Sequence, residues 1–368
     1  MNILFLTNHL NVGGITSYTL SLAKGLKNNG HKVYIASSGG DSLTRFTEQG
    51  IVYIPIPIRT KSEINFFKIG LSFLKLLGQI KEKDIQVIHS NSRVTQVLGF
   101  FLQRFSHRPH ITTWHGFFKK RLSRKLFPFW PDRIIAISES VRDHLIAEFC
   151  APKEAVRLVY NGIDLERLKL QNFKNRDEVK KSFALGAGPV IGIIARLSQV
   201  KGHVFLIQAM KSVLDKIPAA QLLIVGEGRI KTKLTRLSAE LEIEKNVFFI
   251  PKVYNLAEAL YIMDIFVMPS LAEGLGLGLM EAMAWGRPVI GSDVGGIKNL
   301  IRNGDNGLLV RPTDARGLSA AIIELLEDPV KASTLGNNAR VFITENFSLE
   351  KMVSETEGVY QECLDLKD

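Results

Sequence analysis

The chain has 368 residues, of which 46% are hydrophobic and 23% are charged, and its formal net charge is +11. This length exceeds the roughly 100 to 200 residues of a usual domain and predicts two domains, and the composition excludes a disordered chain. Cys150 and Cys363 are too few for a disulfide framework, which indicates a reducing compartment. No apolar stretch approaches the roughly 18 residues that a membrane-spanning helix needs. We therefore expect a cytoplasmic protein without a membrane span.

The positive charge is confined to the first part of the chain. Residues 1–165 contain 22 Lys and Arg against 11 Asp and Glu, whereas the remaining residues contain 25 of each kind. A one-sided basic surface indicates either an anionic partner or a merely solubilising face. Because the sequence contains no recognisable nucleic-acid-binding module, anionic lipid is favoured over nucleic acid as that partner.

Short apolar runs alternate with helix-length stretches in the first half. We expect strands at residues 3–6, 33–36 and 87–89, and helices at residues 15–26 and 64–80. Strands separated by helices predict βαβ units and a parallel sheet.

The second half repeats this alternation. The expected strands are 190–195, 221–225, 247–250, 265–269 and 289–292, and the expected helices are 204–214, 231–241 and 277–284. Both halves are therefore predicted to be doubly wound, Rossmann-like α/β domains. Ligands of such folds bind at the carboxyl ends of the strands, so we expect substrate in a cleft between the two domains.

The expected domain boundaries follow from composition. The first domain spans residues 1–165, and a C-terminal helix at 347–368 is placed to pack back on it. A charged and then glycine-rich stretch at 166–188 is predicted to be a linker. The second domain spans residues 189–346.

The segment 269–288 is the strongest candidate for a ligand site. A strand is expected to end at Pro269, and a helix is expected to begin near Gly276. The free N–H groups at a helix start attract a phosphate, and glycines let it come close. Glu273 and Glu281 are suited to accept hydrogen bonds from sugar and ribose hydroxyl groups. The residues of this turn that we predict to bind the ligand are Gly274, Leu275, Gly276 and Leu277. The alternative is a turn kept for packing, with both glutamates solvated.

A second candidate site lies in the loop that follows the strand at 190–195. Arg196 and Lys201 place two fixed cations five residues apart, a spacing that can grip a diphosphate. The alternative is an ordinary pair of surface cations.

Both segments resemble motifs of glycosyltransferase family 4, a large retaining family with the GT-B fold, and the resemblance covers nearly the whole chain. Residues 273–281 are similar to its Glu-x7-Glu signature, and residues 196–202 are similar to its Arg-x4-Lys-Gly motif. The resemblance implies that Arg196 and Lys201 bind the donor diphosphate and offset the charge that develops on the leaving group. It also implies that Glu281 binds the ribose and that Glu273 lies nearer the transferred sugar.

Further residues match family motifs. Gly14 follows the first strand, where a glycine admits the donor phosphate or the acceptor, although an ordinary tight turn explains it equally well. The resemblance implies that His115 contacts the donor sugar. It places Gly226 and Gly228 near the base and ribose, together with Val253.

Three positions depart from the family pattern. The usual Gly-Gly-x-Pro-Glu appears as the run 295–299, Gly-Gly-Ile-Lys-Asn. Leu275 stands where an aromatic residue is frequent, and Asn91 replaces the second histidine of a His-x-His that begins at His89.

The resemblance implies a retaining glycosyltransferase of polysaccharide or lipopolysaccharide biosynthesis. It moves a sugar from a nucleotide-sugar, with UDP expected as the carrier and GDP second, to a glycan or lipid-linked acceptor. No metal or cofactor is expected, because the sequence shows no Asp-x-Asp or histidine cluster. The alternatives are a GT-B-fold nucleotide-sugar epimerase and a non-catalytic nucleotide-sugar-binding protein. A dinucleotide oxidoreductase is disfavoured, because neither half has Gly-x-Gly-x-x-Gly after its first strand.

The stretch 119–130 combines five cations with apolar and aromatic residues. Such a mixture suits contact with an anionic membrane, which predicts a peripheral position at the inner face of the membrane. The alternative is a solvated charge run beside a core helix.

Overall fold

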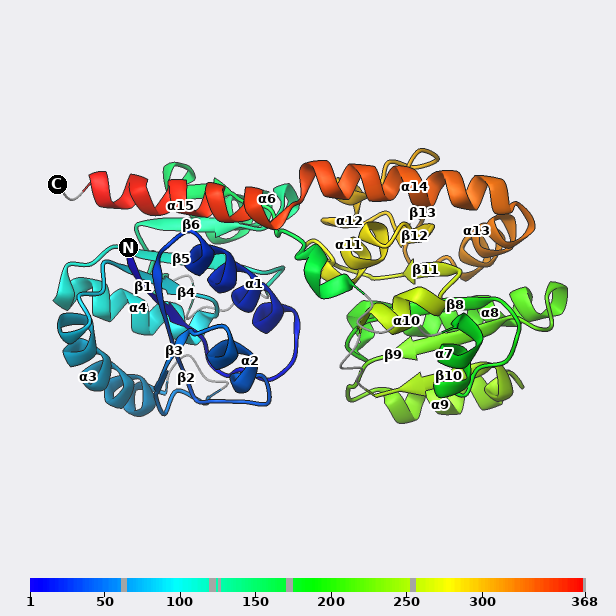
Figure 1. The fold of residues 1–368 in the computed structure, drawn as a ribbon, viewed down its shortest axis with the longest axis horizontal. Coiled ribbons are helices and arrows are strands. Elements are labelled where there is room, and N and C mark those ends of the chain that lie inside the picture. Colours follow the sequence, from blue (N-terminus) through cyan, green and yellow to red (C-terminus); the bar gives the residue numbers. More distant parts are fainter. Residues whose placement is uncertain (61–64, 119–123, 125–126, 170–174, 252–255, 367–368) are drawn as a thin grey trace. The chain divides into compact units, whose positions relative to one another are not determined.

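The computed structural model describes residues 1–60, 65–118, 124, 127–169, 175–251 and 256–366. The chain folds into two compact units (Figure 1). Unit 1 comprises Met1–Gly162 and Ser348–Asp368, and unit 2 comprises Ile163–Phe347. Each unit has its own parallel sheet, as the alternation of strands and helices predicts.

Unit 1 contains a seven-stranded sheet in the order β3-β2-β1-β4-β5-β6-β7. Its strands are β1 (Asn2–Leu6), β2 (Lys32–Ser37), β3 (Val52–Pro55), β4 (Val87–Ser90), β5 (His110–Trp114), β6 (Arg133–Ala136) and β7 (Val156–Leu158). Its α-helices are α1 (Gly14–Asn28), α2 (Leu43–Glu48), α3 (Phe66–Glu82), α4 (Arg93–Ser106), α6 (Glu139–Phe149) and α15 (Leu349–Asp365).

Strand β1 shows why the central strands read as continuous apolar runs. Ile3 and Phe5 pack into the core on the face covered by α1 and α15. Leu4 and Leu6 pack into the core on the opposite face, with α3 and α4. A parallel sheet with helices on both faces buries both sides of each strand.

Unit 2 contains a six-stranded sheet in the order β10-β9-β8-β11-β12-β13. Its strands are β8 (Val190–Ile194), β9 (Gln221–Val225), β10 (Val247–Ile250), β11 (Ile265–Met268), β12 (Val289–Ser292) and β13 (Leu308–Val310). Its α-helices are α7 (Arg176–Ser182), α8 (His203–Lys216), α9 (Lys231–Glu240), α10 (Leu256–Ile262), α11 (Leu277–Ala284), α12 (Ile297–Leu300), α13 (Ala315–Glu327) and α14 (Pro329–Asn346).

Both sheets reverse their strand order at one point. In unit 1 the reversal lies between β1 and β4, and in unit 2 it lies between β8 and β11. Ligands of doubly wound folds bind beyond the carboxyl ends of the two strands that flank such a point. The candidate residues therefore belong to the loops after β8 and β11 in unit 2 and after β1 and β4 in unit 1.

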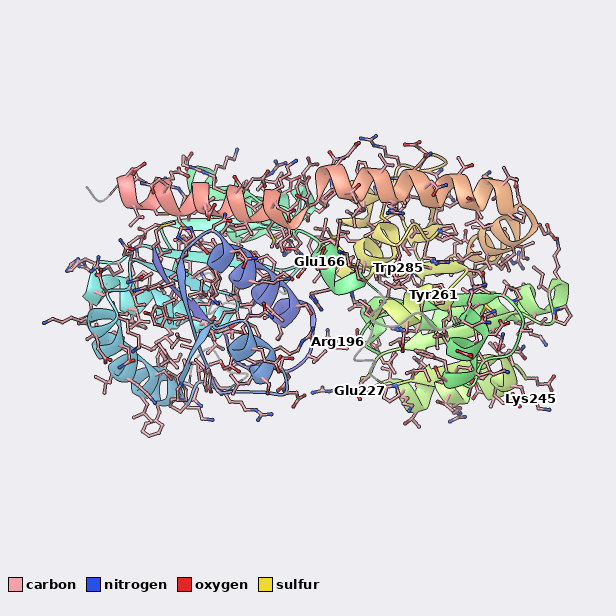
Figure 2. All side chains as sticks on the ribbon, in the orientation of Figure 1. Glu166, Arg196, Glu227, Lys245, Tyr261 and Trp285 are labelled. Atoms are coloured by element: carbon pink, nitrogen blue, oxygen red, sulfur yellow. The ribbon has the colours of Figure 1, made fainter. Side chains whose placement is uncertain are left out.

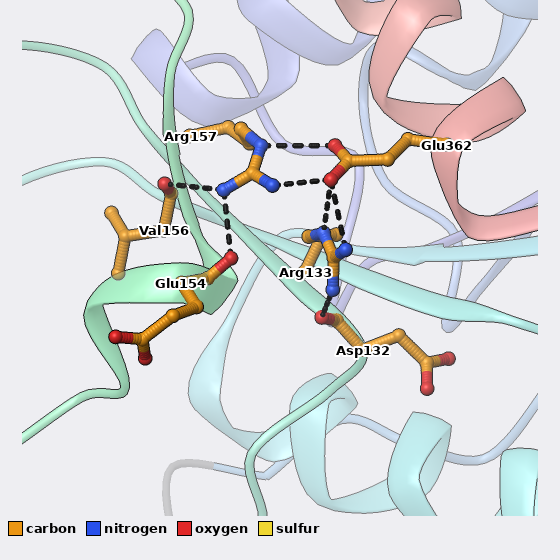
Figure 3. Close-up of polar contacts among 6 residues, drawn as sticks. All are labelled: Asp132, Arg133, Glu154, Val156, Arg157 and Glu362. Carbon is orange, nitrogen blue, oxygen red and sulfur yellow. Dashed lines mark hydrogen bonds and ion pairs between the residues drawn. The ribbon is translucent and has the colours of Figure 1, made fainter. Parts of the chain in front are cut away.

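Helix α15 ends the chain but belongs to unit 1 (red in Figure 1). It packs on α1, where Val353 lies so close to Gly25 that a Cβ there would come within 2.3 Å of a Val353 methyl group. At its C-terminal end, Glu362 accepts hydrogen bonds from Arg133 Nε at 3.0 Å and Arg157 Nε at 2.9 Å (Figure 3). These bonds lower the pKa of Glu362 to about 2. The pair of arginines ties α15 to β6 and β7, at one edge of the sheet.

The segment 166–188, expected as a linker, lies within unit 2. It contains the end of a short 3-10 helix (Leu165–Leu168) and the whole of α7. Arg176 of α7 donates a hydrogen bond to Asp264 Oδ1 at 2.6 Å, and Lys180 Nζ donates to the carbonyl of Gly188 at 2.8 Å. Side chains of this stretch are thus part of the packing of unit 2. No helix in the described ranges is long and apolar enough to cross a membrane.

Candidate active site

Three loops of unit 2 meet beyond the carboxyl ends of β8, β9 and β11. Leu197 N donates to the carbonyl of Glu227 at 2.9 Å, and Leu271 N donates to the carbonyl of Val200 at 2.7 Å. Arg196 is exposed at the start of the first of these loops (Figure 2). The backbone thus holds together the loops that carry Arg196, Lys201 and Glu273.

Lys201 and Glu273 form an ion pair across two of these loops. The side chain of Lys201 is 21% exposed and that of Glu273 is 11% exposed, so water screens the pair only partly. Ser270 Oγ donates a second hydrogen bond to the same carboxylate oxygen at 3.3 Å. The structure thus brings together two residues that the sequence motifs name separately, and it holds the ammonium group of Lys201 in place.

The start of α11 presents backbone N–H groups that no side chain caps. Gly276 has φ of 96°, a left-handed conformation that favours glycine, and no side chain caps the helix. No acidic residue lies in the first turn. A Cβ on Gly278 would lie 2.7 Å from the carbonyl oxygen of Ile194, so the helix start packs tightly against the end of β8. An anion is the natural partner for such a helix start.

The side chains of the other residues of this turn are largely buried. Gly274 is buried and the side chain of Leu275 is 1% exposed, so Leu275 packs in the core. Leu277 is half-buried. The frequent aromatic residue of the family is therefore replaced here by a core leucine, and the turn offers its backbone to a ligand.

Glu281 lies one turn inside α11 and is half-buried. Its carboxylate makes no hydrogen bond or ion pair with any described residue. Burial raises the pKa of Glu281 to about 7, and nearby Arg167 partly opposes that rise. A half-buried carboxylate without a partner has acceptor capacity left for hydroxyl groups.

Two glycines of the loop after β9 are required by packing. A Cβ on Gly226 would lie 2.1 Å from the carbonyl oxygen of Ala195, and a Cβ on Gly228 would lie 2.1 Å from that of Leu197. The N–H of Gly226 already donates to the carbonyl of Ile250 at 2.9 Å. Both glycines thus allow the Arg196 loop to lie against this one. Val253 lies outside the described residues.

In unit 1, α1 begins at Gly14 with no side-chain cap and no acidic residue in its first turn. Val12, Gly13 and Gly14 are exposed. A Cβ on Gly13 would meet no atom within 4 Å, and its φ of 168° is extended backbone that any residue adopts. Packing therefore gives no reason for glycine at position 13.

His115 follows β5 and is held on two sides. Its Nε2 lies 3.2 Å from Asn91 Oδ1, and its ring packs edge-on against Tyr18 with centroids 4.7 Å apart. Burial lowers the pKa of His115 to about 3, so the imidazole is neutral at physiological pH. Asn91, which departs from the family pattern, thus orients His115 here.

A chain of buried hydrogen bonds lies behind His115. His89 Nδ1 lies 2.6 Å from the hydroxyl of Tyr360 on α15, and His89 Nε2 lies 2.7 Å from Thr113 Oγ1. Thr113 in turn bonds the hydroxyl of Tyr18 at 3.2 Å. Burial holds the pKa of His89 well below its usual value, so His89 is neutral, with one nitrogen donating and the other accepting. The C-terminal helix is thus coupled to the side chain that packs on His115.

The structure adds residues that the sequence patterns did not identify. They are Tyr18, Asn91, Arg167, Ser270 and Tyr360. Asn91 and Ser270 lie within segments that the sequence analysis names, but the motifs assign them no role in the site. The others acquire a role through contacts with residues distant in sequence.

Two further predictions concern a metal ion and the basic stretch 119–130. Their His, Cys, Asp and Glu side chains form no group of three or more that could hold a metal ion. In the basic stretch 119–130, residues 119–123 and 125–126 lie outside the described residues. His115 belongs to unit 1, and Arg196, Lys201, Glu273 and Glu281 belong to unit 2.

Two family models match this chain in tandem. The model described as Glycosyltransferase Family 4 matches residues 12–167, and the model described as Glycosyl transferases group 1 matches residues 175–342. The chain belongs to glycosyltransferase family 4. It is a glycosyltransferase, as the Glu-x7-Glu and Arg-x4-Lys-Gly resemblances predict.

Relatives match this glycosyltransferase along its length. N-acetyl-alpha-D-glucosaminyl L-malate synthase of Bacillus anthracis is 28% identical, covering 98% of this chain and 96% of the relative. UDP-Gal:alpha-D-GlcNAc-diphosphoundecaprenol alpha-1,3-galactosyltransferase of Escherichia coli is 25% identical, covering 95% and 94%. The structure of HepE from Anabaena, in complex with UDP and glucose, matches with a TM-score of 0.87 and 21% identity, covering 98% and 99%. These matches confirm the predicted GT-B fold.

Proposed function

We propose that this glycosyltransferase moves a sugar from a UDP-sugar to a lipid-linked or glycan acceptor, with retention of anomeric configuration. Unit 2 binds the donor and unit 1 binds the acceptor. One observation carries the proposal: Arg196, the Lys201–Glu273 pair and the uncapped start of α11 meet at the switch point of the unit 2 sheet. The UDP in the HepE structure and the UDP-Gal and diphosphoundecaprenol in the Escherichia coli relative's name support the choice of donor and acceptor class.

The proposed chemistry follows from these groups. The bond between the anomeric carbon and the diphosphate oxygen breaks, and its electron pair stays on the diphosphate. Arg196, Lys201 and the N–H groups of α11 stabilise that charge. The acceptor hydroxyl oxygen bonds to the anomeric carbon from the same face, and its proton passes to the departing phosphate. Glu281 accepts from the ribose hydroxyls, and Glu273 accepts from hydroxyls of the transferred sugar.

The group that unit 1 contributes to the proposed reaction, His115, is uncharged. His115 has its pKa lowered to about 3 and is held by Asn91 and Tyr18. A neutral imidazole can exchange hydrogen bonds with sugar hydroxyls without adding charge. Because two cations and a helix start already face the diphosphate, the proposal assigns no metal to this step, and transfer should persist in EDTA.

Thermal shift and titration calorimetry with UDP, GDP and ADP test the donor. A ligand that binds only the folded protein raises its melting temperature, and UDP is expected to raise it most. Incubation with UDP-hexoses and an undecaprenyl-diphosphate-linked sugar should then give a glycosylated lipid with the donor's anomeric configuration by NMR. A changed nucleotide-sugar in the absence of any acceptor would identify an epimerase instead. Binding of UDP-sugar without turnover over a full acceptor panel would indicate a non-catalytic binding protein.

A further inference from the structure

Helix α3 of unit 1 carries apolar side chains on two faces. Its core face consists of Ile69, Ser72, Leu76 and Ile80, which are buried. Phe67, Leu71 and Leu74 are instead 76%, 44% and 69% exposed. Their spacing of four and then three residues places them on one face of the helix. This second stripe takes no part in the core of unit 1.

Two further aromatic side chains on α3 and α4 are exposed. Phe66, at the start of α3, is 56% exposed, and Phe105 of the adjacent helix α4 is 62% exposed. The ring of Phe73 on α3 lies 5.2 Å from that of Phe105, so the two helices join at this point. The apolar face of unit 1 comprises Phe66, Phe67, Leu71, Leu74 and Phe105. Exposed apolar side chains that gather on one part of a soluble protein mark an interaction site.

Basic residues outnumber acidic residues on the two helices. The basic residues of α3 and α4 are Lys68, Lys75, Lys81, Arg93 and Arg104, and the single acidic residue is Glu82. Glu82 is paired with Lys83 at 3.3 Å. Lys75, Lys81 and Arg104 are exposed. An apolar stripe fringed by cations complements a surface that is apolar below and anionic above.

We propose that the apolar face of unit 1 docks on a bilayer that contains anionic lipid. Phe67 and Leu74 enter the boundary between headgroups and acyl chains, and Lys75, Lys81 and Arg104 contact the headgroups. This docking brings unit 1 to the surface in which a lipid-linked acceptor resides. It rests on the geometry and charge of α3 and α4 and not on the proposed transfer reaction, so either can fail alone.

Vesicle flotation tests the docking directly. The full-length protein is mixed with vesicles of phosphatidylcholine alone or with 30 mol% phosphatidylglycerol, on the order of the anionic content that attracts basic segments. The wild type should float with the anionic vesicles, and less so at high salt. The double variant Phe67→Glu/Leu74→Glu should bind at least about tenfold more weakly, since two apolar side chains no longer enter the bilayer. Lys75→Ala/Arg104→Ala should lose the preference for anionic vesicles.

A matched control separates this face from general apolar exposure. Val330 of α14 in unit 2 is 77% exposed, and Val330→Glu should float like the wild type. Circular dichroism and the melting temperature should be unchanged in every variant, because the replaced side chains contribute little to the core. Undiminished flotation of Phe67→Glu/Leu74→Glu, or no flotation of the wild type, overturns the proposal. A wild-type dimer that the double variant converts to monomer, with no vesicle binding, overturns it in favour of a second copy of this chain.

Discussion

In unit 1, His89, Thr113, Tyr18 and Tyr360 share hydrogen bonds in one buried chain, whereas in unit 2 the carboxylate of Glu281 has no partner among the described residues. The unit 1 chain is neutral, because burial holds the pKa of His89 well below its usual value. The unit 2 site is charged, with the Lys201–Glu273 pair beside exposed Arg196.

This difference in hydrogen-bond partners distinguishes residues that stabilise the fold from residues that are suited to bind a ligand. A buried group that already has its partners contributes to stability, and its removal leaves those partners unsatisfied. A half-buried carboxylate without a partner costs stability in the absence of ligand, and such costs concentrate at functional sites. Replacements in unit 1 should therefore act first on unfolding, and replacements in unit 2 should act first on the ligand.

The largest expected effect concerns the two site cations. Arg196→Ala and Lys201→Ala should each lower kcat by roughly 100- to 1000-fold, the range seen when a group that stabilises developing charge is removed. The melting temperature of Arg196→Ala should hardly change, because the side chain is exposed. Steady-state kinetics with Lys211→Ala, an exposed lysine on the outer side of α8, provide the control. Near-normal transfer by both variants would break the assignment of the charged site.

The second effect separates the two glutamates. Glu281→Ala should weaken UDP binding by roughly tenfold, since it removes a contact made about equally in the ground and transition states. Glu273→Ala should bind UDP at least as tightly as the wild type, because it frees Lys201 from its ion pair. It should turn over poorly, because it loses the proposed contact with the transferred sugar. Titration calorimetry without acceptor compares the two variants. Equal loss of UDP binding in both would place both carboxylates at the nucleotide.

The third effect is the pH dependence of Glu281. Its folded pKa of about 7 lies above the usual 4.5, so the folded state holds this proton more tightly and loses stability as pH rises through 7. Glu281→Gln removes the charge and should therefore stabilise the ligand-free protein at pH 8 by about 1 to 2 kcal/mol, allowing for solvent screening. At pH 5 the two proteins should melt alike. UDP affinity should rise more between pH 6 and 8 in the wild type than in Glu281→Gln, in which the terminal phosphate of UDP, with a second pKa of about 6, still titrates.

The smallest effect tests the neutral chain in unit 1. Tyr360→Phe removes the hydroxyl that bonds His89 and should lower the free energy of unfolding by about 1 to 2 kcal/mol, because a buried nitrogen loses its partner. UDP affinity should be unchanged. Tyr53→Phe is the matched control, since the Tyr53 hydroxyl bonds the carbonyl of Ser37 from a half-buried position. An equal loss of unfolding free energy in both variants would show that the buried chain stabilises the fold no more than the half-buried hydrogen bond of Tyr53.

Much of this architecture is readable from the sequence, because apolar runs mark central strands. The expected strand at 221–225 and the expected helix at 277–284 coincide with β9 and α11. Short edge strands such as β3 and β13 were not predicted, since edge strands have one paired side and a weak apolar pattern. The exposure of the outer stripe of α3 is also not predictable, because periodicity identifies an apolar face without showing which face the fold covers.

The site was predictable only in part. Motifs name Lys201 and Glu273 separately, but their ion pair joins residues 72 positions apart, on loops that adjacent strands bring together. Glycine motifs were ambiguous in the same way: Gly228 is dictated by a carbonyl oxygen that would lie 2.1 Å from its Cβ, whereas Gly13 has nothing near it. Packing distances, which a sequence does not contain, distinguish these two roles.

The return of α15 to unit 1 has a consequence for synthesis of the protein. Tyr360 and Glu362 leave the ribosome after all of unit 2, although their partners His89, Arg133 and Arg157 emerge long before. Unit 2 can thus complete its sheet while still tethered to the ribosome, whereas unit 1 waits with α1 and the β7 edge uncovered. A chain truncated after residue 347 should therefore have a protease-resistant unit 2 and a protease-sensitive unit 1.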